Sequence, residues 1–78
     1  MKPIVTEKAV LAIESANTLT FETEKERTKT ELKEEIERIF KVKVENLSTM
    51  IKGNKKYVYV KLKKEFPAID IATKLGLI

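Results

Sequence analysis

The N-terminal half of the chain switches between two hydrophobic periods. Between Thr6 and Asn17, apolar residues recur at helical spacing and form one stripe. Thr favours the start of a helix and Asn tolerates the left-handed conformation at its end, so these two residues are the predicted caps. Residues 18–23 then alternate apolar with polar side chains and are rich in β-branched residues. This pattern predicts a strand with Leu19 and Phe21 pointing inward.

A second helix is predicted immediately after a charged connection. Thr28 and Glu31 have the spacing of a capping box, in which Thr28 accepts from the Glu31 amide and the Glu31 carboxylate reaches back. The apolar residues that follow lie at i, i+4, i+7 and i+8, on one helix face: Leu32, Ile36, Ile39 and Phe40. Charged residues occupy the opposite face.

The C-terminal half begins with two predicted strands. Alternation from Lys41 predicts a strand that continues to Ile51, and its apolar parity changes between Val44 and Leu47. Such a change indicates a bulge or bend near residues 45–46. Gly and Asn at positions 53 and 54 predict a turn, and residues 55–63 alternate again as a strand.

A third helix is predicted to begin at Pro67, because Pro favours the first helical position, and Gly76 suits its C-cap. The element order is therefore α-β-α-β-β-α. We expect an α/β (α+β) two-layer sandwich formed by one domain, residues 1–78. Its antiparallel three-stranded sheet would have the order 1-3-2, with the helices packed on one face.

Composition excludes several classes of chemistry. The chain has no Cys and no His, so thiolate and imidazole ligands, disulfides, Cys nucleophiles and the commonest general base are absent. The carboxylates of the second helix alternate with basic residues, as in a solvated face. We therefore expect no enzyme, no metal and no cofactor. We also expect a cytoplasmic protein, because no targeting segment is found and no apolar run approaches the roughly 20 residues of a membrane span.

Charge is distributed unevenly along the chain. The net charge of +4 combines −2 for residues 1–40, where seven Lys and Arg face nine Glu, with +6 for residues 41–78, where nine Lys face three acids. Much of this excess lies between Lys52 and Lys64. A basic surface facing a polyanionic partner is expected there.

The predicted central strand carries the clearest candidate chemistry. Tyr57 and Tyr59 alternate with lysines, and they would lie on the uncovered face of the sheet. RNA-binding sheets use this combination, because rings stack on bases while lysines contact phosphates. Two tyrosines on a half-exposed strand would also fit strand propensity alone. Likewise, the lysines at 52, 55 and 56 favour contact with a polyanion, although a solvated hairpin tip has the same composition.

The whole chain also resembles a known family, through motifs that occur in order. They are Ile4-Val5-Thr6-Glu7-Lys8-Ala9, Asn17-Thr18-Leu19-Thr20-Phe21, Thr28-Lys29, Phe40-Lys41-Val42-Lys43-Val44 and Asp70-Ile71-Ala72-Thr73-Lys74-Leu75-Gly76. Together they resemble family twenty-three of the universal large-subunit ribosomal proteins. The short Lys52–Lys56 connection and the Leu-Gly-Leu-Ile terminus are similar to its archaeal branch.

The resemblance implies a non-catalytic protein of the large ribosomal subunit. Such proteins bind large-subunit ribosomal RNA beside the polypeptide exit tunnel, next to a ribosomal protein of family twenty-nine. They help form a docking platform for nascent-chain factors such as the signal recognition particle. Glu7 matches the position that contacts the chaperone trigger factor in bacterial members, and we assign it to protein docking. The expected RNA contacts are Lys8, Asn17, Thr18, Lys29, Lys43, Lys52, Lys55, Lys56, Tyr57 and Lys61.

Two alternatives of other classes remain open at the level of sequence. The aromatic and basic central strand would suit a free-standing RRM-like module that binds single-stranded RNA. Against this module, the only aromatic residue of the first strand is Phe21, whose parity points into the core, and the glycine of the RNP1 motif is missing. The acidic N-terminal half would suit a protein adapter with an acidic helix and no role in RNA binding.

Overall fold

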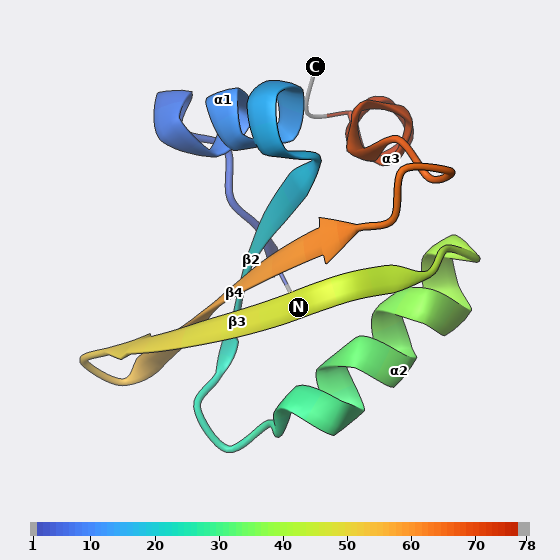
Figure 1. The fold of residues 1–78 in the computed structure, drawn as a ribbon. Coiled ribbons are helices and arrows are strands. Elements are labelled where there is room, and N and C mark those ends of the chain that lie inside the picture. Colours follow the sequence, from blue (N-terminus) through green and yellow to red (C-terminus); the bar gives the residue numbers. More distant parts are fainter. Residues whose placement is uncertain (1, 77–78) are drawn as a thin grey trace.

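Three helices and a four-stranded antiparallel sheet make up residues 2–76, the part of the chain described by the computed structural model (Figure 1). In chain order the elements are β1 (Lys2–Pro3), α1 (Glu7–Ala16), β2 (Thr18–Glu24), α2 (Lys29–Phe40), β3 (Val44–Lys52), β4 (Lys55–Leu62) and α3 (Ala68–Lys74). Met1, Leu77 and Ile78, which belong to the predicted domain and to the C-terminal motif, lie outside the described residues.

The sheet has the order β1-β2-β4-β3, which corrects the predicted three-stranded sheet. The three predicted strands do lie in the expected relative order, with β4 between β2 and β3. The additional strand, β1, pairs Lys2 with Glu22 and Pro3 with Phe21 at the sheet edge. Two residues are too few to show an alternating pattern. The proline is tolerated because an edge strand leaves one side of its backbone unpaired.

The hydrophobic core lies on one face of the sheet, where all three helices contribute to it. Leu19 and Phe21 of β2 are buried, as predicted, and they cluster with side chains of β4 and with Leu32 and Ile36 of α2. Helices α1 and α3 add Ile13, Ala68, Ile71 and Ala72. The rings of Phe21 and Phe40 stack with their centroids 6.1 Å apart, which ties the C-terminal end of α2 to the sheet.

The predicted caps of α1 and α2 are largely confirmed. The hydroxyl of Thr6 accepts from the Ala9 amide at 3.1 Å, and that of Thr28 accepts from the Glu31 amide at 3.2 Å. Asn17 ends α1 in the left-handed conformation, with φ 51°. The Glu31 carboxylate was expected to reach back to Thr28, but it lies 3.4 Å from Nε of Arg27. An ion pair one turn away therefore takes the place of the second half of the capping box.

The predicted starts of β3 and α3 are wrong, and the bulge is confirmed. The strand predicted from Lys41 starts at Val44, because Lys41 adopts φ 55° and ends α2 in the left-handed conformation. The helix predicted to begin at Pro67 begins at Ala68, with Pro67 as its cap. The register of β3 against β4 shifts between Val44 and Asn46, where the change of parity indicated a bulge.

Candidate nucleic-acid interface

The face of the sheet opposite the core gathers two tyrosines of β4 and lysines from several strands. Residues paired across antiparallel strands point to the same side, so the register defines this surface. Tyr59 lies between Thr20 and Ser48, and Tyr57 lies between Glu22 and Met50. We call it the open sheet face; its residues are Lys2, Thr18, Thr20, Glu22, Glu24, Asn46, Ser48, Met50, Lys52, Lys55, Tyr57, Tyr59 and Lys61.

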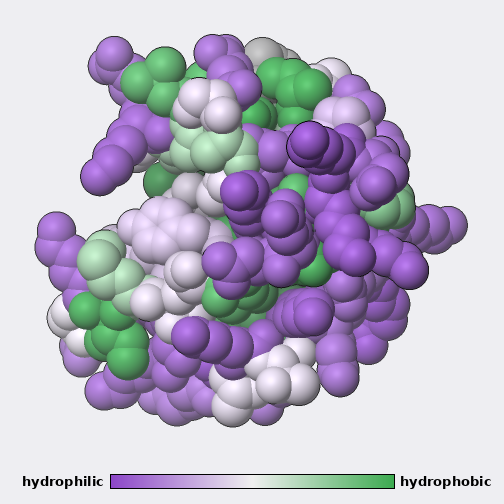
Figure 2. Space-filling view, viewed as in Figure 1, coloured by the Kyte–Doolittle hydropathy of each residue, from purple (hydrophilic) through white to green (hydrophobic). Residues whose placement is uncertain are grey.

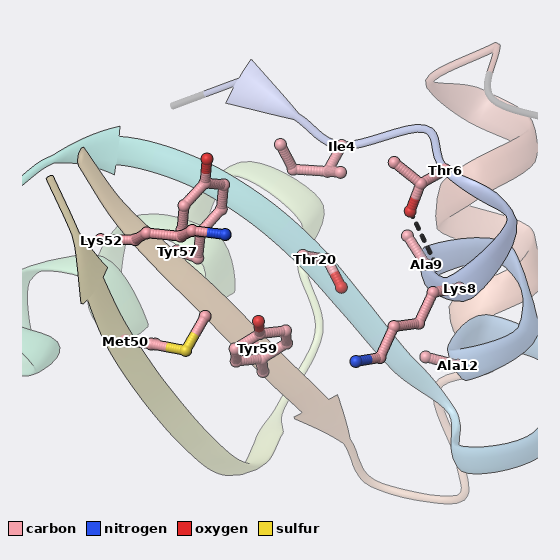
Figure 3. Close-up of a pocket in the computed structure, with 10 residues that line it drawn as sticks. All are labelled: Ile4, Thr6, Lys8, Ala9, Ala12, Thr20, Met50, Lys52, Tyr57 and Tyr59. Carbon is pink, nitrogen blue, oxygen red and sulfur yellow. Dashed lines mark hydrogen bonds between the residues drawn. The ribbon is translucent and has the colours of Figure 1, made fainter.

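A groove of about 350 Å³ lies where α1 overhangs this face. We call it the tyrosine groove. Tyr57, Tyr59 and Met50 line its sheet side, while Ala9 and Ala12 line its helix side (Figure 3). Figure 2 shows the hollow as a notch below α1, bordered by pale and apolar atoms and surrounded by hydrophilic ones.

Lysines stand at both sides of the tyrosine groove. Lys8 projects from the first turns of α1 and Lys52 from the end of β3, and both are solvent-exposed (Figure 3). None of the residues that line the groove carries a carboxylate. The groove therefore combines an apolar, aromatic interior with a cationic rim, which suits an anionic partner with a flat apolar part.

An ion pair modifies the charge of the open sheet face near the hairpin. Nζ of Lys55 lies 2.8 Å from Oε1 of Glu22, which is its diagonal neighbour across β2 and β4. This hydrogen bond lowers the pKa of the Glu22 carboxyl below 4.5 and raises the pKa of the Lys55 ammonium above 10.5. Lys55 is 65% exposed, so its ammonium remains accessible to a further anion.

Lys56 lies on the other side of the sheet. Its Nζ donates to the backbone carbonyl of Arg27 at 2.6 Å, at the connection that leads into α2. Consecutive strand residues alternate between faces, so Lys55 and Lys56 cannot both serve the open sheet face. The geometry gives Lys56 a structural contact on the helix side, so the RNA contact expected of it lies outside the open sheet face.

Asn17 and Thr18 also make contacts within the fold. Nδ2 of Asn17 lies within 3.0 to 3.3 Å of the carbonyls of Leu62, Lys63 and Phe66, and its Oδ1 accepts from the Ala68 amide at 2.6 Å. Since an amide nitrogen has two protons, Asn17 has no donor left for a ligand. The hydroxyl of Thr18 donates to the Ala16 carbonyl at 2.9 Å.

The structure therefore divides the residues expected to contact RNA. Lys8, Lys52 and Tyr57 meet in the tyrosine groove, and Thr18, Lys55 and Lys61 share the open sheet face with them. Lys29 begins α2 and Lys43 precedes β3; both are exposed and belong to neither surface. Glu7, expected to dock a protein, is exposed in the first turn of α1.

Several groove residues were not among the predicted contacts. Tyr59 has the same strand parity as Tyr57, so the alternation already placed both rings on one side. The face on which Met50 lies depends on the register after Asn46, so it can be predicted only when the position of the bulge is known. Ala9 and Ala12 had no sequence signal beyond the helix stripe, because only the tertiary arrangement places them above the sheet.

The side chains and helices of residues 2–76 also bear on two other kinds of site, a metal centre and a membrane span. No group of three or more acidic side chains in this part of the chain is arranged to hold a metal ion. No helix among the same residues has the length and apolar character needed to cross a membrane.

Comparison with known proteins identifies the family. Residues 1–69 match the family model described as ribosomal protein L23. The large ribosomal subunit protein uL23 of Pyrobaculum aerophilum is 44% identical over 77 residues, which cover 96% of this chain and 94% of that protein. The protein of the same description from Methanococcus aeolicus is 43% identical over 77 residues, with 96% and 88% covered. The resemblance seen in the motifs is thus confirmed, and this chain belongs to the ribosomal protein L23 family.

Proposed function

We propose that this protein is a non-catalytic constituent of the large ribosomal subunit in the cytoplasm, where it binds large-subunit ribosomal RNA through the open sheet face. The observation that carries the proposal is the gathering of Lys8, Lys52 and Lys61 around two tyrosines on the sheet face opposite the core, where α1 overhangs one part. Lysines neutralise phosphates, and each phosphate contact releases condensed counterions. Membership of the L23 family supports the assignment to the large subunit.

The opposite side of the molecule has the properties of a protein-binding surface. Exposed acidic and basic side chains alternate along α2, and Ile39 is 56% exposed among them. A surface of mixed charge around an exposed apolar side chain attracts a polyanion less than a basic surface does, so this side suits solvent or proteins better than nucleic acid. Here we place the contacts with the neighbouring ribosomal protein of family twenty-nine and with nascent-chain factors such as the signal recognition particle. Glu7, in the first turn of α1 rather than on α2, is proposed as a further docking residue. The family resemblance supports the proposed position beside the exit tunnel.

A free-standing RRM-like module fits the structure less well. Such a module stacks bases on rings from its two central strands. In this protein Phe21 of β2 is buried in the core with 2% of its surface exposed, so the rings on the open sheet face come from β4. The missing RNP1 glycine argues in the same direction.

Sedimentation of a cell extract through a sucrose gradient tests the proposal. The protein should travel with large subunits at moderate salt and leave them as salt rises, because lysine–phosphate contacts weaken with ionic strength. A Lys8→Glu, Lys61→Glu variant should remain near the top of the gradient, while a Glu34→Gln variant on α2 should still enter the subunit peak. Free protein alone at moderate salt would contradict the proposal.

A further inference from the structure

We propose that the tyrosine groove binds one unstacked nucleotide of ribosomal RNA, with the base against Tyr59 and the neighbouring phosphates at Lys8 and Lys52. This inference rests on the proposed function and assigns the groove a role within it. Contact of the RNA backbone with the rest of the open sheet face requires no such insertion.

The first argument is the shape and lining of the groove. Its volume, about 350 Å³, lies near the lower end of the range for small-molecule pockets, about 300–1,000 Å³. The lining is apolar and aromatic, with Tyr57, Tyr59 and Met50 on the sheet side. A flat base can cover an aromatic ring without needing a particular hydrogen-bond pattern.

The second argument is the small size of the residues that α1 places over the groove. Ala9 and Ala12 present methyl groups where most helix residues would present longer side chains. The gap between the helix and the sheet stays open for this reason (Figure 3). Ala12 lines the groove, so a longer side chain at this position would narrow it without removing any chemical group.

The third argument is charge. Lys8 and Lys52 come from different elements and flank the same apolar interior, and no carboxylate lines it. Phosphates on either side of an inserted base would complement these two ammonium groups. An apolar peptide segment would fill the interior but would leave both cations unpaired, so a nucleotide is the better match.

The test uses the whole protein and deproteinised large-subunit RNA from an archaeon. Filter binding at several salt concentrations measures affinity, and ultraviolet crosslinking followed by mass spectrometry identifies the residue joined to RNA. We expect a crosslink at Tyr59. Ala12→Leu should remove it and weaken binding by about 5- to 150-fold, the worth of one stacked base. Ala16→Leu makes the same change on the exposed end of α1, outside the groove, and should leave both readouts unchanged.

Ring and charge variants separate stacking from phosphate contact. Tyr59→Phe should keep the affinity and Tyr59→Leu should lose it, with circular dichroism reporting the fold of each. Should Tyr59→Leu fail to fold, the half-exposed Ala12 position decides the question. Lys52→Ala should reduce the slope of log affinity against log salt by about 0.7, as expected for one phosphate on a single strand.

The outcomes distinguish the groove from the wider function. RNA binding that survives Ala12→Leu unchanged, without a crosslink at either tyrosine, overturns the nucleotide proposal and leaves the proposed function standing. No binding of the wild-type protein to this RNA overturns both. An apolar peptide that displaces the RNA, and whose binding is lost in Ala12→Leu but kept in Lys52→Ala, would assign the groove to a protein segment and also overturn the proposal.

Discussion

The Oδ1 atom of Asn17 accepts a hydrogen bond from the Ala68 amide at 2.6 Å, across 51 residues of sequence. The same side chain donates toward the carbonyls of Leu62 and Phe66. One residue at the end of α1 thus holds the end of β4, the connection after it and the first turn of α3. Pro67, the cap of α3, makes no side-chain hydrogen bond to the helix. The Asn17 side chain instead accepts from the first amide of α3, as a capping side chain would.

Replacing Asn17 should destabilise the fold in two separable ways. Asn17→Gly keeps a residue suited to φ 51° but leaves backbone groups of the β4–α3 connection unpaired, which should cost about 1–3 kcal/mol. Asn17→Ala should cost about 1 kcal/mol more, because an L-residue with a Cβ disfavours the left-handed conformation. Urea unfolding followed by circular dichroism measures both. Wild-type midpoints for both variants would show that the amide does not stabilise α3.

The Glu22–Lys55 pair should make stability depend on pH at the acid end. The pKa of Glu22 is lowered in the folded protein, mainly by its hydrogen bond to Lys55, so the pair stabilises the fold above pH 4.5. That contribution is lost as the pH falls through the folded pKa. Glu22→Gln should therefore lower the melting temperature slightly near neutral pH and low salt, and should match the wild type in acid.

Glu24→Gln is the matched control for this pair. Glu24 lies opposite Lys55 in the register but is exposed at the end of β2, and the ion pair is with Glu22. Its removal should change the melting temperature less than Glu22→Gln at neutral pH. Equal effects of the two substitutions, or an effect of Glu22→Gln that persists in acid, would contradict the assignment.

Lys56 and Lys61 should affect different properties. Lys61→Ala should weaken binding to large-subunit RNA and reduce the salt slope by about 0.7–0.9, with stability unchanged, because Lys61 is exposed on the open sheet face. Lys56→Ala should destabilise the fold by about 1 kcal/mol through loss of the bond to the Arg27 carbonyl, and should barely change RNA affinity. Filter binding and urea unfolding of both variants check this. Interchanged results would place RNA on the helix side.

Lys41 occupies a conformation better suited to glycine. It ends α2 with φ 55° and ψ 45°, and its side chain is exposed. Lys41→Gly should therefore raise the free energy of unfolding by about 0.5–1 kcal/mol. Lys43→Gly, in the same connection but without a positive φ, should lower it. Urea unfolding measures the stability of the two variants. Stabilisation by Lys43→Gly alone would contradict the role given to the left-handed conformation of Lys41.

Local pattern predicted the elements whose signals are contained in a few neighbouring residues. Alternation placed Leu19 and Phe21 in the core, and the change of parity after Val44 indicated the bulge. Thr6 and Thr28 cap their helices as expected. Strand β1 was missed because a pair of residues carries no period, and Lys41 was misread because an αL residue can sit inside an alternating run.

The site was harder to predict because it depends on how distant elements meet. The sequence already required that Lys55 and Lys56 face opposite ways, yet composition alone grouped them at one hairpin tip. Asn17 has an amide side chain that could contact RNA, but its long-range hydrogen bonds within the fold appear only in three dimensions. The tyrosine groove exists because α1 overhangs β2 and β4, a relationship without any local signal.

Hydroxyl-radical footprinting of the protein bound to deproteinised large-subunit RNA tests most directly whether RNA meets the open sheet face. Met50, Tyr57 and Tyr59 report on that face, and Ile39 of α2 reports on the helix side. We predict that oxidation of the first three falls on binding while that of Ile39 stays constant. Protection of Ile39 with unchanged oxidation of Met50 and both tyrosines would contradict the account.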